Sequence, residues 1–405
     1  MREMKDSGEK LLEQIPASWG LVHLKYLCDI QTGNQDTQDA NPDGEYDFYV
    51  RSPIVERSDT YTFEGDGILM AGDGAGAGRV FHHAFGKYAV HQRVYRISNY
   101  RDVQSGYLFY YLSNIFPSVM DMGSAQSTVP SVRLPMLQSL NVCLPSLNEQ
   151  HRISTFLDSK CSEIDALTAD IQSQIDTIEQ YKRSIITEAV TKGLDKQAHV
   201  KDSGVFYMAP MNENWYLTKI GYICSKLARS FEPEDTALIC SNKGKVLIRP
   251  EDASGIMVSE DNAMQGIHEG DIAIHGMDTW HGAIALSDYD GKITRVVHVC
   301  DSTEDKRFIV YYLQYLAFQG VYKLISNGVR ENTSDFRSWD KVRDIWIAIP
   351  KSKSEQKEIC DYLDDMCAEI EGTVAIKNDQ LATLYAYKKS IIYEYVTGKK
   401  EVPAV

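Results

Sequence analysis

The sequence of 405 residues lacks a long hydrophobic run, a signal-like N-terminus and any closely spaced cysteine pair. No apolar run approaches the roughly 20 residues of a membrane span, and the opening "MREMKDSGEKLLEQ" has no apolar core. The eight cysteines include no CxxC pair, and the closest couple, Cys360 and Cys367, is seven apart, outside the usual zinc spacing. We therefore expect reduced, mostly structural thiols in a cytoplasmic protein with no membrane partner.

The glycine-rich stretch "ILMAGDGAGAGRVF", Ile68 to Phe81, lacks the context of a phosphate-binding loop. It contains no GxxxxGK[ST] sequence. Gly72, Gly74 and Ala77 fit the loose form G-x-G-x-x-[GA], but "RVFHHAFGKYAVHQRV" behind them predicts strand and turn where a helix is required. The glycines would instead let the backbone approach a ligand closely. Because the Asn/Asp-Pro-Pro-aromatic tetrad of amino-methyltransferases is also missing, we predict no cofactor site.

Patterns for catalysis and metal binding are missing as well. His82, His83 and His91 have no cysteine or carboxylate cluster that would complete a metal site. The Pro42-Asp43 pair has no D/E-x-K at nuclease-like distance, and no nucleophile elbow surrounds a serine. We predict no catalytic residue and no metal site in this chain.

The net charge of −15, from 42 basic and 57 acidic residues, argues against a nucleic-acid partner when taken alone. The distribution of charged residues along the chain, however, is compatible with a nucleic-acid partner. Residues 74–101 contain no Asp or Glu but five Lys or Arg, and residues 237–250 contain no acid but three Lys or Arg. An acidic protein with two local basic windows is compatible with DNA binding.

The chain repeats itself at an offset of about 200 residues, which is the strongest signal in the sequence. "KDSG" occurs at 5–8 and again at 201–204, and Trp19 pairs with Trp215 at the same offset. "EGDGIL" matches "EGDIAI", and "LPSLNEQHRISTFLDSKCSEID" matches "IPKSKSEQKEICDYLDDMCAEIE". Short strand-like stretches with turns and some helix lie between these matches, so we predict an α+β fold in two tandem pseudo-symmetric halves.

Each half closes on a heptad pattern that predicts a long helix. Apolar residues recur every seven positions, and those predicted to pair the two helices are Leu157, Ile164, Ile171, Ile178, Ile185, Leu363, Ile370, Leu384 and Ile391. Ile153, Leu167, Ile175 and Tyr181 are expected at the alternate positions of the first helix, and Lys377 is a polar break in the second. Plain core packing would give the same stripe, but two equivalent rods in one chain favour an antiparallel coiled coil.

"KDSG…W" at the start of each half, a "GD" strand in each middle and "P…EQ…I…L" before each helix give a resemblance over the whole length. The chain resembles the specificity subunit of type I restriction–modification systems. The resemblance implies two target-recognition domains, residues 1–145 and 196–350, and two conserved spacer helices, residues 146–195 and 351–405. It also implies a non-catalytic subunit that reads a bipartite, asymmetric sequence in double-stranded DNA.

The same resemblance implies the partners of the chain. Two modification (methyltransferase) subunits would dock on the conserved helices, and restriction subunits that translocate DNA would join them. S-adenosylmethionine, ATP and Mg²⁺ would then bind to those partners, with no cofactor bound by this chain.

Loops that differ between the two halves predict the DNA contacts. Arg79 suits bidentate contact with guanine or phosphate, and Trp280, in a loop flanked by Gly and His, suits a contact with DNA. The predicted DNA-binding residues are Arg79, Lys87, Gln92, Arg93, Gln126, Lys243, Lys245, His275, Trp280, His281, Arg330 and Asn332. A solvated surface position is the alternative for each of them. A structural ion pair is a further alternative for Arg93, and a core position is a further alternative for Trp280.

Other functions stay open at this stage. A coiled-coil scaffold whose globular ends bind proteins would show no salt-dependent affinity for DNA. An enzyme that uses the glycine loop would bind a cofactor as the isolated chain. A specificity subunit of a related modification system outside type I would share the features above.

Overall fold

The computed structural model describes residues 2–123, 130–250, 263–326 and 335–403. The chain has mixed α and β content and forms two compact units. The first unit comprises Met1–Gln172 with Asn378–Val405, and the second comprises Ser173–Lys377. Each unit is a set of residues that contact one another, and each includes segments of the long helices. The predicted division into two recognition domains and two spacer helices follows a different criterion and stays a prediction.

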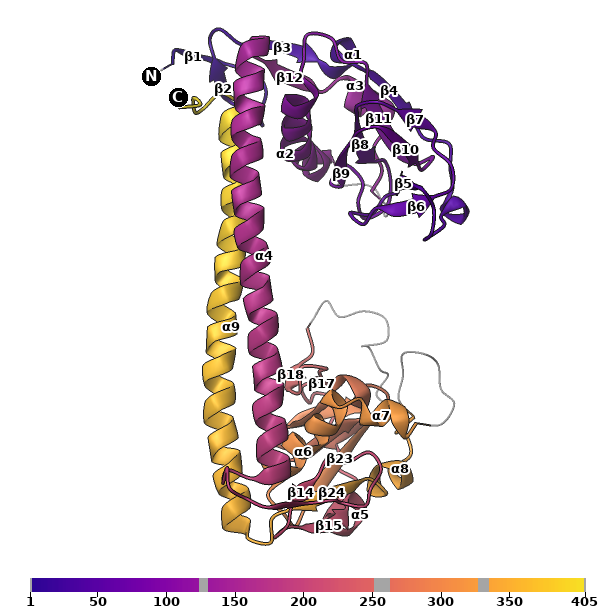
Figure 1. Cartoon of the computed structure of the whole chain (residues 1–405), viewed down its shortest axis with the longest axis vertical. Helices are drawn as coiled ribbons and strands as arrows, with labels where there is room; N and C mark the ends of the chain where they lie inside the picture. The colour runs from indigo at the N-terminus through magenta and orange to yellow at the C-terminus, as the bar shows by residue number, and fades with distance from the viewer. Residues whose placement is uncertain (1, 124–129, 251–262, 327–334, 404–405) are drawn as a thin grey trace. The chain divides into compact units, whose positions relative to one another are not determined.

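The first unit contains two four-stranded sheets and two two-stranded ladders (Figure 1). One sheet, of order β4-β11-β8-β9, is antiparallel throughout, while the other, of order β6-β5-β10-β7, includes the parallel pair β5 and β10. The strands are β1 (Met4–Asp6), β2 (Gln14–Pro16), β3 (Gly20–His23), β4 (Asp29–Thr32), β5 (Tyr46–Tyr49), β6 (Glu56–Ser58), β7 (Phe63–Glu64), β8 (Gly67–Ala71), β9 (Phe81–Ala84), β10 (Lys87–Val90), β11 (Val94–Ser98) and β12 (Asn141–Leu144). The helices are α1 (Leu24–Leu27), η1 (Thr37–Asp39), α2 (Ser105–Gly123) and α3 (Leu134–Gln138).

The second unit has one four-stranded sheet, of order β16-β23-β20-β21, and four two-stranded ladders. Its strands are β13 (Val200–Lys201), β14 (Met211–Asn212), β15 (Tyr216–Lys219), β16 (Cys224–Lys226), β17 (Leu238–Cys240), β18 (Val246–Ile248), β19 (Met264–Ile267), β20 (Ile272–His275), β21 (Ile284–Leu286), β22 (Gly291–Thr294), β23 (Val297–Ser302) and β24 (Trp346–Ile349). Its short helices are α5 (Ile220–Ile223), η4 (Thr279–His281), α6 (Lys306–Phe318), α7 (Val321–Leu324) and α8 (Trp339–Arg343).

The inner strands β8 and β20, each in a four-stranded sheet, are buried on both faces. In β8, Ile68 and Met70 pack into the core that holds α2, whereas Leu69 packs on the opposite face with Tyr88 and Val90. In β20 the corresponding alternation puts Ile272 and Ile274 on one face and Ala273 on the other. Burial on both faces explains why "ILMA" and "IAI" are continuous apolar runs with no polar alternation.

The repeated sequence motifs tie each unit to the start of its own long helix. The Lys5 ammonium donates to the carbonyls of Ala17 (3.0 Å) and Trp19 (2.6 Å), and the Trp19 indole N–H donates to Glu149 (3.1 Å). In the second unit Lys201 and Trp215 make the same contacts, with Trp215 donating to Glu355 (2.8 Å). The motifs are therefore structural, because each satisfies buried polar groups at one helix start.

The long helices are α4 (Leu147–Lys192) and α9 (Lys353–Val396). Each is followed by a glycine of positive φ, Gly193 (87°) and Gly398 (71°), as helix C-termini favour. A Cβ on Gly398 would lie 2.4 Å from Cγ of Pro16, so close packing on the first unit also requires glycine there.

Within each unit the segments of α4 and α9 lie side by side and run antiparallel (Figure 1). In the first unit Lys388 of α9 bonds to Asp165 of α4 (2.6 Å), and the rings of Phe156 and Tyr395 lie 4.5 Å apart. In the second unit Lys182 bonds to Glu371 (2.8 Å). Lys377, the expected polar break, bonds to Gln174 of the facing helix, which is how a polar residue is accommodated between two helices.

The predicted pairing residues are all buried or half-buried, but two of the alternate positions were wrong. Leu167 and Tyr181 are 53% and 55% exposed. Their neighbours Thr168 and Lys182 are half-buried and complete the 3-4 spacing with Cys161 and Ile175. The prediction chose the apolar residues Leu167 and Tyr181, each one position before the residue that lies at the helix contact. One residue corresponds to about 100° around a helix, which is enough to turn a side chain outward.

Candidate nucleic-acid interface

The glycine loop of the first unit, residues 72–80, connects β8 to β9 and packs against its own unit. Gly76 and Gly78 are the tight positions: an added Cβ would lie 2.5 Å from the carbonyl oxygen of Arg51 and 2.6 Å from Cγ of Met120 respectively. Gly78 also has a φ of +64°. At these two positions glycine serves internal packing, so the expectation that it makes room for a ligand is corrected there. The strand expected behind the loop is β9.

Two arginines and one carboxylate converge beside this loop. Asp73 accepts hydrogen bonds from Nη1 of Arg51 (2.9 Å) and Nη1 of Arg93 (2.5 Å), one on each carboxylate oxygen. The Asp73 side chain is 19% exposed, whereas those of Arg51 and Arg93 are 41% and 60% exposed. Burial opposes the ionisation of Asp73, but the bonds from Arg93 and Arg51 outweigh it and lower the pKa of this carboxyl. We call Arg51, Asp73 and Arg93 the arginine cluster.

The arginine cluster rests on a fixed backbone. The Gly72 N–H donates to the carbonyl of Arg93 (2.8 Å), and the Val132 N–H donates to the carbonyl of Gly72 (2.7 Å). The Arg93 N–H donates to Nδ1 of His91 (3.0 Å), a residue only 2% exposed. Burial lowers the pKa of His91, which keeps that nitrogen free of a proton and able to accept.

Of the predicted residues in this unit, Arg93 belongs to the cluster, Gln92 is its neighbour in the sequence, and Arg79 and Lys87 do not join it. The Gln92 amide donates to Asp36 (2.9 Å). Arg79 bonds to Asp121 at the end of α2, and the Lys87 ammonium lies 4.7 Å from the centre of the Tyr61 ring. Gln126 lies outside the described residues. Sequence reasoning missed Arg51 and Asp73, because Arg51 falls outside the acid-free window and Asp73 looked like part of a glycine loop.

The second unit keeps the same backbone frame but places different side chains on it. The Gly276 N–H donates to the carbonyl of Val296 (2.9 Å), and the Phe336 N–H donates to the carbonyl of Gly276 (2.9 Å). These bonds match those at Gly72 in the first unit. The residues that correspond to Asp73 and Arg93 are therefore Met277 and Val296, so among the described residues these two positions carry no charge in the second unit.

The predicted residues of the second unit divide between this edge and the helices. Nδ1 of His275 accepts from the Asp278 N–H (3.1 Å), and burial lowers the pKa of His275, so its ring is neutral. The Trp280 ring lies 3.5 Å from that of His281, between centroids, and Lys323 lies 3.9 Å from its centre. Lys245 bonds to Glu371 of α9 (2.7 Å). Lys243 is exposed in the turn between β17 and β18, while Arg330 and Asn332 lie outside the described residues.

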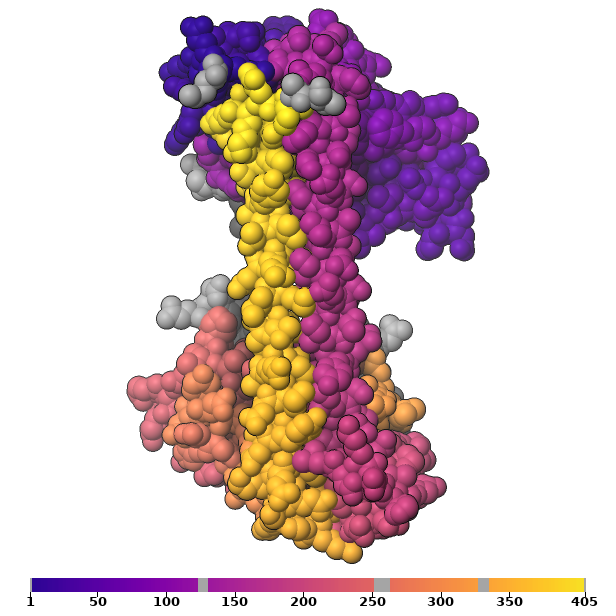
Figure 2. All heavy atoms as spheres, turned by 60° about the vertical axis from the view of Figure 1, so that its left-hand side comes forward, coloured from indigo at the N-terminus to yellow at the C-terminus, as the bar shows by residue number. Residues whose placement is uncertain are grey.

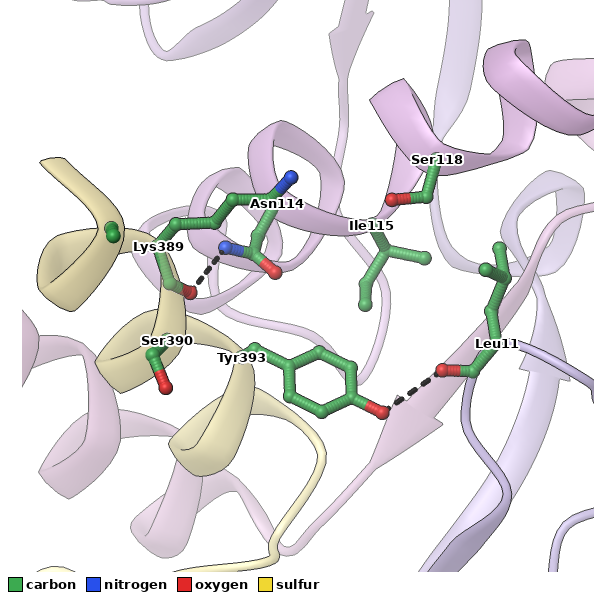
Figure 3. Close-up of a pocket in the computed structure, with 8 residues that line it drawn as sticks. Leu11, Asn114, Ile115, Ser118, Lys389, Ser390 and Tyr393 are labelled. Carbon is green, nitrogen blue, oxygen red and sulfur yellow. Dashed lines mark hydrogen bonds between the residues drawn. The ribbon is translucent and has the colours of Figure 1, made fainter. Parts of the chain in front are cut away.

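A hollow of about 330 Å³ lies between α2 and α9 of the first unit (Figure 3). Two of its polar side chains are bonded within the unit: Asn114 donates to the carbonyl of Lys389 (2.9 Å) and Tyr393 donates to that of Leu11 (3.0 Å). At the repeat positions of Leu11 and Asn114 the second unit has Tyr207 and Tyr315, which pack against its core. The second unit therefore has larger aromatic side chains at the two corresponding positions.

Over residues 2–123, 130–250, 263–326 and 335–403, no group of three or more His, Cys, Asp and Glu lies close enough to hold a metal ion. No helix within them is long and apolar enough to cross a membrane. All eight cysteines are free and buried, and burial raises the pKa of the Cys28 thiol to about 12.

Known proteins share features with this chain. Residues 16–177 match the model of the type I restriction modification DNA specificity domain. The chain is 22% identical to the type I restriction enzyme EcoDI specificity subunit of Escherichia coli, over 74% of this chain and 71% of that protein. It is 24% identical to the putative type I restriction enzyme MjaX specificity subunit of Methanocaldococcus jannaschii, over 75% and 70%.

A solved structure shares the fold. A chain from a structural study of complex assembly and conformational transition in the type I R-M system superposes with a TM-score of 0.64, at 14% identity, and covers 95% of this chain and 99% of its own length. The domain match and the two relatives agree with the motifs that hold each unit to its helix, and on these grounds residues 16–177 carry a type I restriction modification DNA specificity domain and the chain is similar to the specificity subunits of type I restriction–modification systems.

Proposed function

We propose that the chain reads two different half-sites of one DNA sequence and positions modification subunits on it, while having no catalytic residues of its own. The observation that carries this proposal is the shared backbone frame with unlike side chains. Gly72 and Gly276 make the same two backbone bonds, yet the first unit places the arginine cluster at this edge and the second places His275 with Met277. One frame with two sets of side chains is what an asymmetric, bipartite target requires.

The long helices would set the distance between the half-sites. α4 has 46 residues and α9 has 44, so each spans about 65 to 70 Å at roughly 1.5 Å per residue. We propose that the pairing seen in each unit continues as one antiparallel coiled coil, with the two halves as tandem copies at its ends. The ion pairs Lys388–Asp165 and Lys182–Glu371 support one register along both helices, because the residue numbers of each pair sum to the same value, 553.

The outer faces of the helices would receive the partners. Both helices are uncovered on the face turned toward the viewer in Figure 2. Large apolar side chains that are more than half exposed on them are Leu147, Leu167, Tyr181, Ile376, Tyr385 and Tyr387. Exposed apolar residues gathered on two helices favour a protein partner. We propose that modification subunits cover them and bring S-adenosylmethionine, and that restriction subunits bring ATP and Mg²⁺.

Methylation mapping tests the proposal. DNA from a host that expresses the chain with its modification subunits would be sequenced by a single-molecule method that detects methyladenine. We expect one bipartite motif with a methyladenine in each half, which disappears when this chain is deleted. An assembled complex that methylates no bipartite motif would contradict the proposal and favour the scaffold function, in which the globular ends bind proteins.

A further inference from the structure

We infer that the arginine cluster reads a guanine in the half-site of the first unit, with Arg93 and Arg51 as the contacting residues and Asp73 as the positioning residue. This inference rests on the proposed function and adds to it the identity of the reader and of the base. Arg51 and Asp73 extend the set of residues that the sequence suggested, in which only Arg93 appeared.

The exposure of the three side chains fits a reader. The carboxylate lies beneath, at 19% exposure, and the two guanidinium groups lie outside it, at 41% and 60%. The three residues come from three separate segments: Arg51 follows β5, Asp73 follows β8, and Arg93 precedes β11. Because Asp73 binds Nη1 of both arginines, it fixes their orientation before any DNA arrives. Such preorganisation lowers the entropy lost when a contact forms.

The hydrogen-bonding capacity left over matches guanine. An arginine carries five N–H donors, and Asp73 accepts one from each. Over the parts of the chain that the structure describes, no other bond to the Arg93 side chain is present, so its remaining donors face solvent. Guanine presents two acceptors, O6 and N7, in the major groove, and a guanidinium group meets both. The cluster also has a net charge of +1, which favours DNA.

Comparison of the two units shows which residues at this edge are needed for the fold and which are free to contact DNA. The backbone bonds at Gly72 and Gly276 are the same, but Met277 and Val296 stand where Asp73 and Arg93 stand. The frame therefore forms without the charged residues, so the ion pairs are not needed to build this edge of the sheet. The charged residues of the first unit add guanidinium N–H donors that face solvent. The second unit has no such donors at the positions of Asp73 and Arg93.

The test uses the complex of this chain with its modification subunits. The variants are R93A, R93K, R51A and D73N, and the matched control is R101A, whose guanidinium is 51% exposed and pairs with Asp29 beyond the other end of β11. Methylation rates would be measured on duplexes that carry each base pair at each position of the first half-site. A further duplex would carry 7-deazaguanine, which lacks the N7 acceptor.

We expect R93A and R93K to lose about 10- to 100-fold discrimination at one guanine of the first half-site, with the second half-site unchanged. D73N would lose part of this discrimination, and R101A none. Wild-type complex would discriminate against 7-deazaguanine at that position, and R93A would not. R93K keeps a cation beside Asp73, so its loss would reflect the missing fork and not misfolding.

Two outcomes would overturn the inference while leaving the proposed function intact. One is an unchanged motif in R93A. The other is a loss that is equal for all sequences with a salt slope reduced by about one, which is the behaviour of a phosphate contact. If wild-type complex shows no bipartite motif, the proposed function itself fails and the inference falls with it.

Discussion

Two leucines ten positions apart on α4 provide a direct test of which face of the helix is buried. Leu157 is 0% exposed, whereas Leu167 is 53% exposed. Replacing leucine by alanine removes about three methylene equivalents, worth about 2.4 kcal/mol at about 0.8 kcal/mol each, and a buried site adds a cavity cost. We expect L157A to lower the free energy of unfolding by about 3 to 4 kcal/mol and L167A to lower it by less than about 0.5 kcal/mol.

The measurement is urea unfolding of the full chain, followed by circular dichroism at 222 nm. L363A, in the second unit, is the matched repeat of L157A, since Leu363 is also 0% exposed and stands 206 positions later. The two units can unfold separately, so each transition is fitted by itself. Equal losses for L157A and L167A would refute the assignment of the buried face, because both substitutions remove the same atoms from the same helix.

The remaining predictions concern glycine, charge and pH. G398A should destabilise the first unit, because φ at this position is +71° and the added Cβ would meet Pro16. G372A should stabilise α9 by up to about 1 kcal/mol, because a Cβ added there would have no atom within 4 Å outside its own helix. Thermal unfolding of the two variants measures both effects. K245A should leave the methylated motif unchanged, because its ammonium is bonded to Glu371 of α9, and a motif altered in the second half would contradict this. The low pKa of Asp73 contributes stability that is present above its unfolded value of about 3.9 and is lost as the pH falls through its folded value. D73N should thus cost up to about 1 kcal/mol at pH 7 and progressively less below pH 4, and a difference independent of pH would refute the ion pairs.

The difference between the two units bears on how such a protein changes its target. Frame residues such as Trp19 and Glu149 recur as Trp215 and Glu355 with the same hydrogen bond. Positions at the sheet edge do not recur, since Asp73 is replaced by Met277. A chain built this way can exchange the side chains at this edge of the sheet without changing the contacts that hold each globular part to its helix.

The repeat, the heptads and the short strand-like stretches determined the long helices and the α+β class, because these depend on local periodicity. They also carried the family resemblance. Tertiary structure alone decided which side chains meet. Arg51, Asp73 and Arg93 lie 20 or more positions apart, and only the pairing of β8 with β11 brings Asp73 to Arg93. It likewise turned Leu167 outward and half-buried Lys182, and brought the Lys245 ammonium to Glu371 of α9. Periodicity identifies a face to within about one residue, whereas contact between distant side chains depends on strand register, which no local pattern contains.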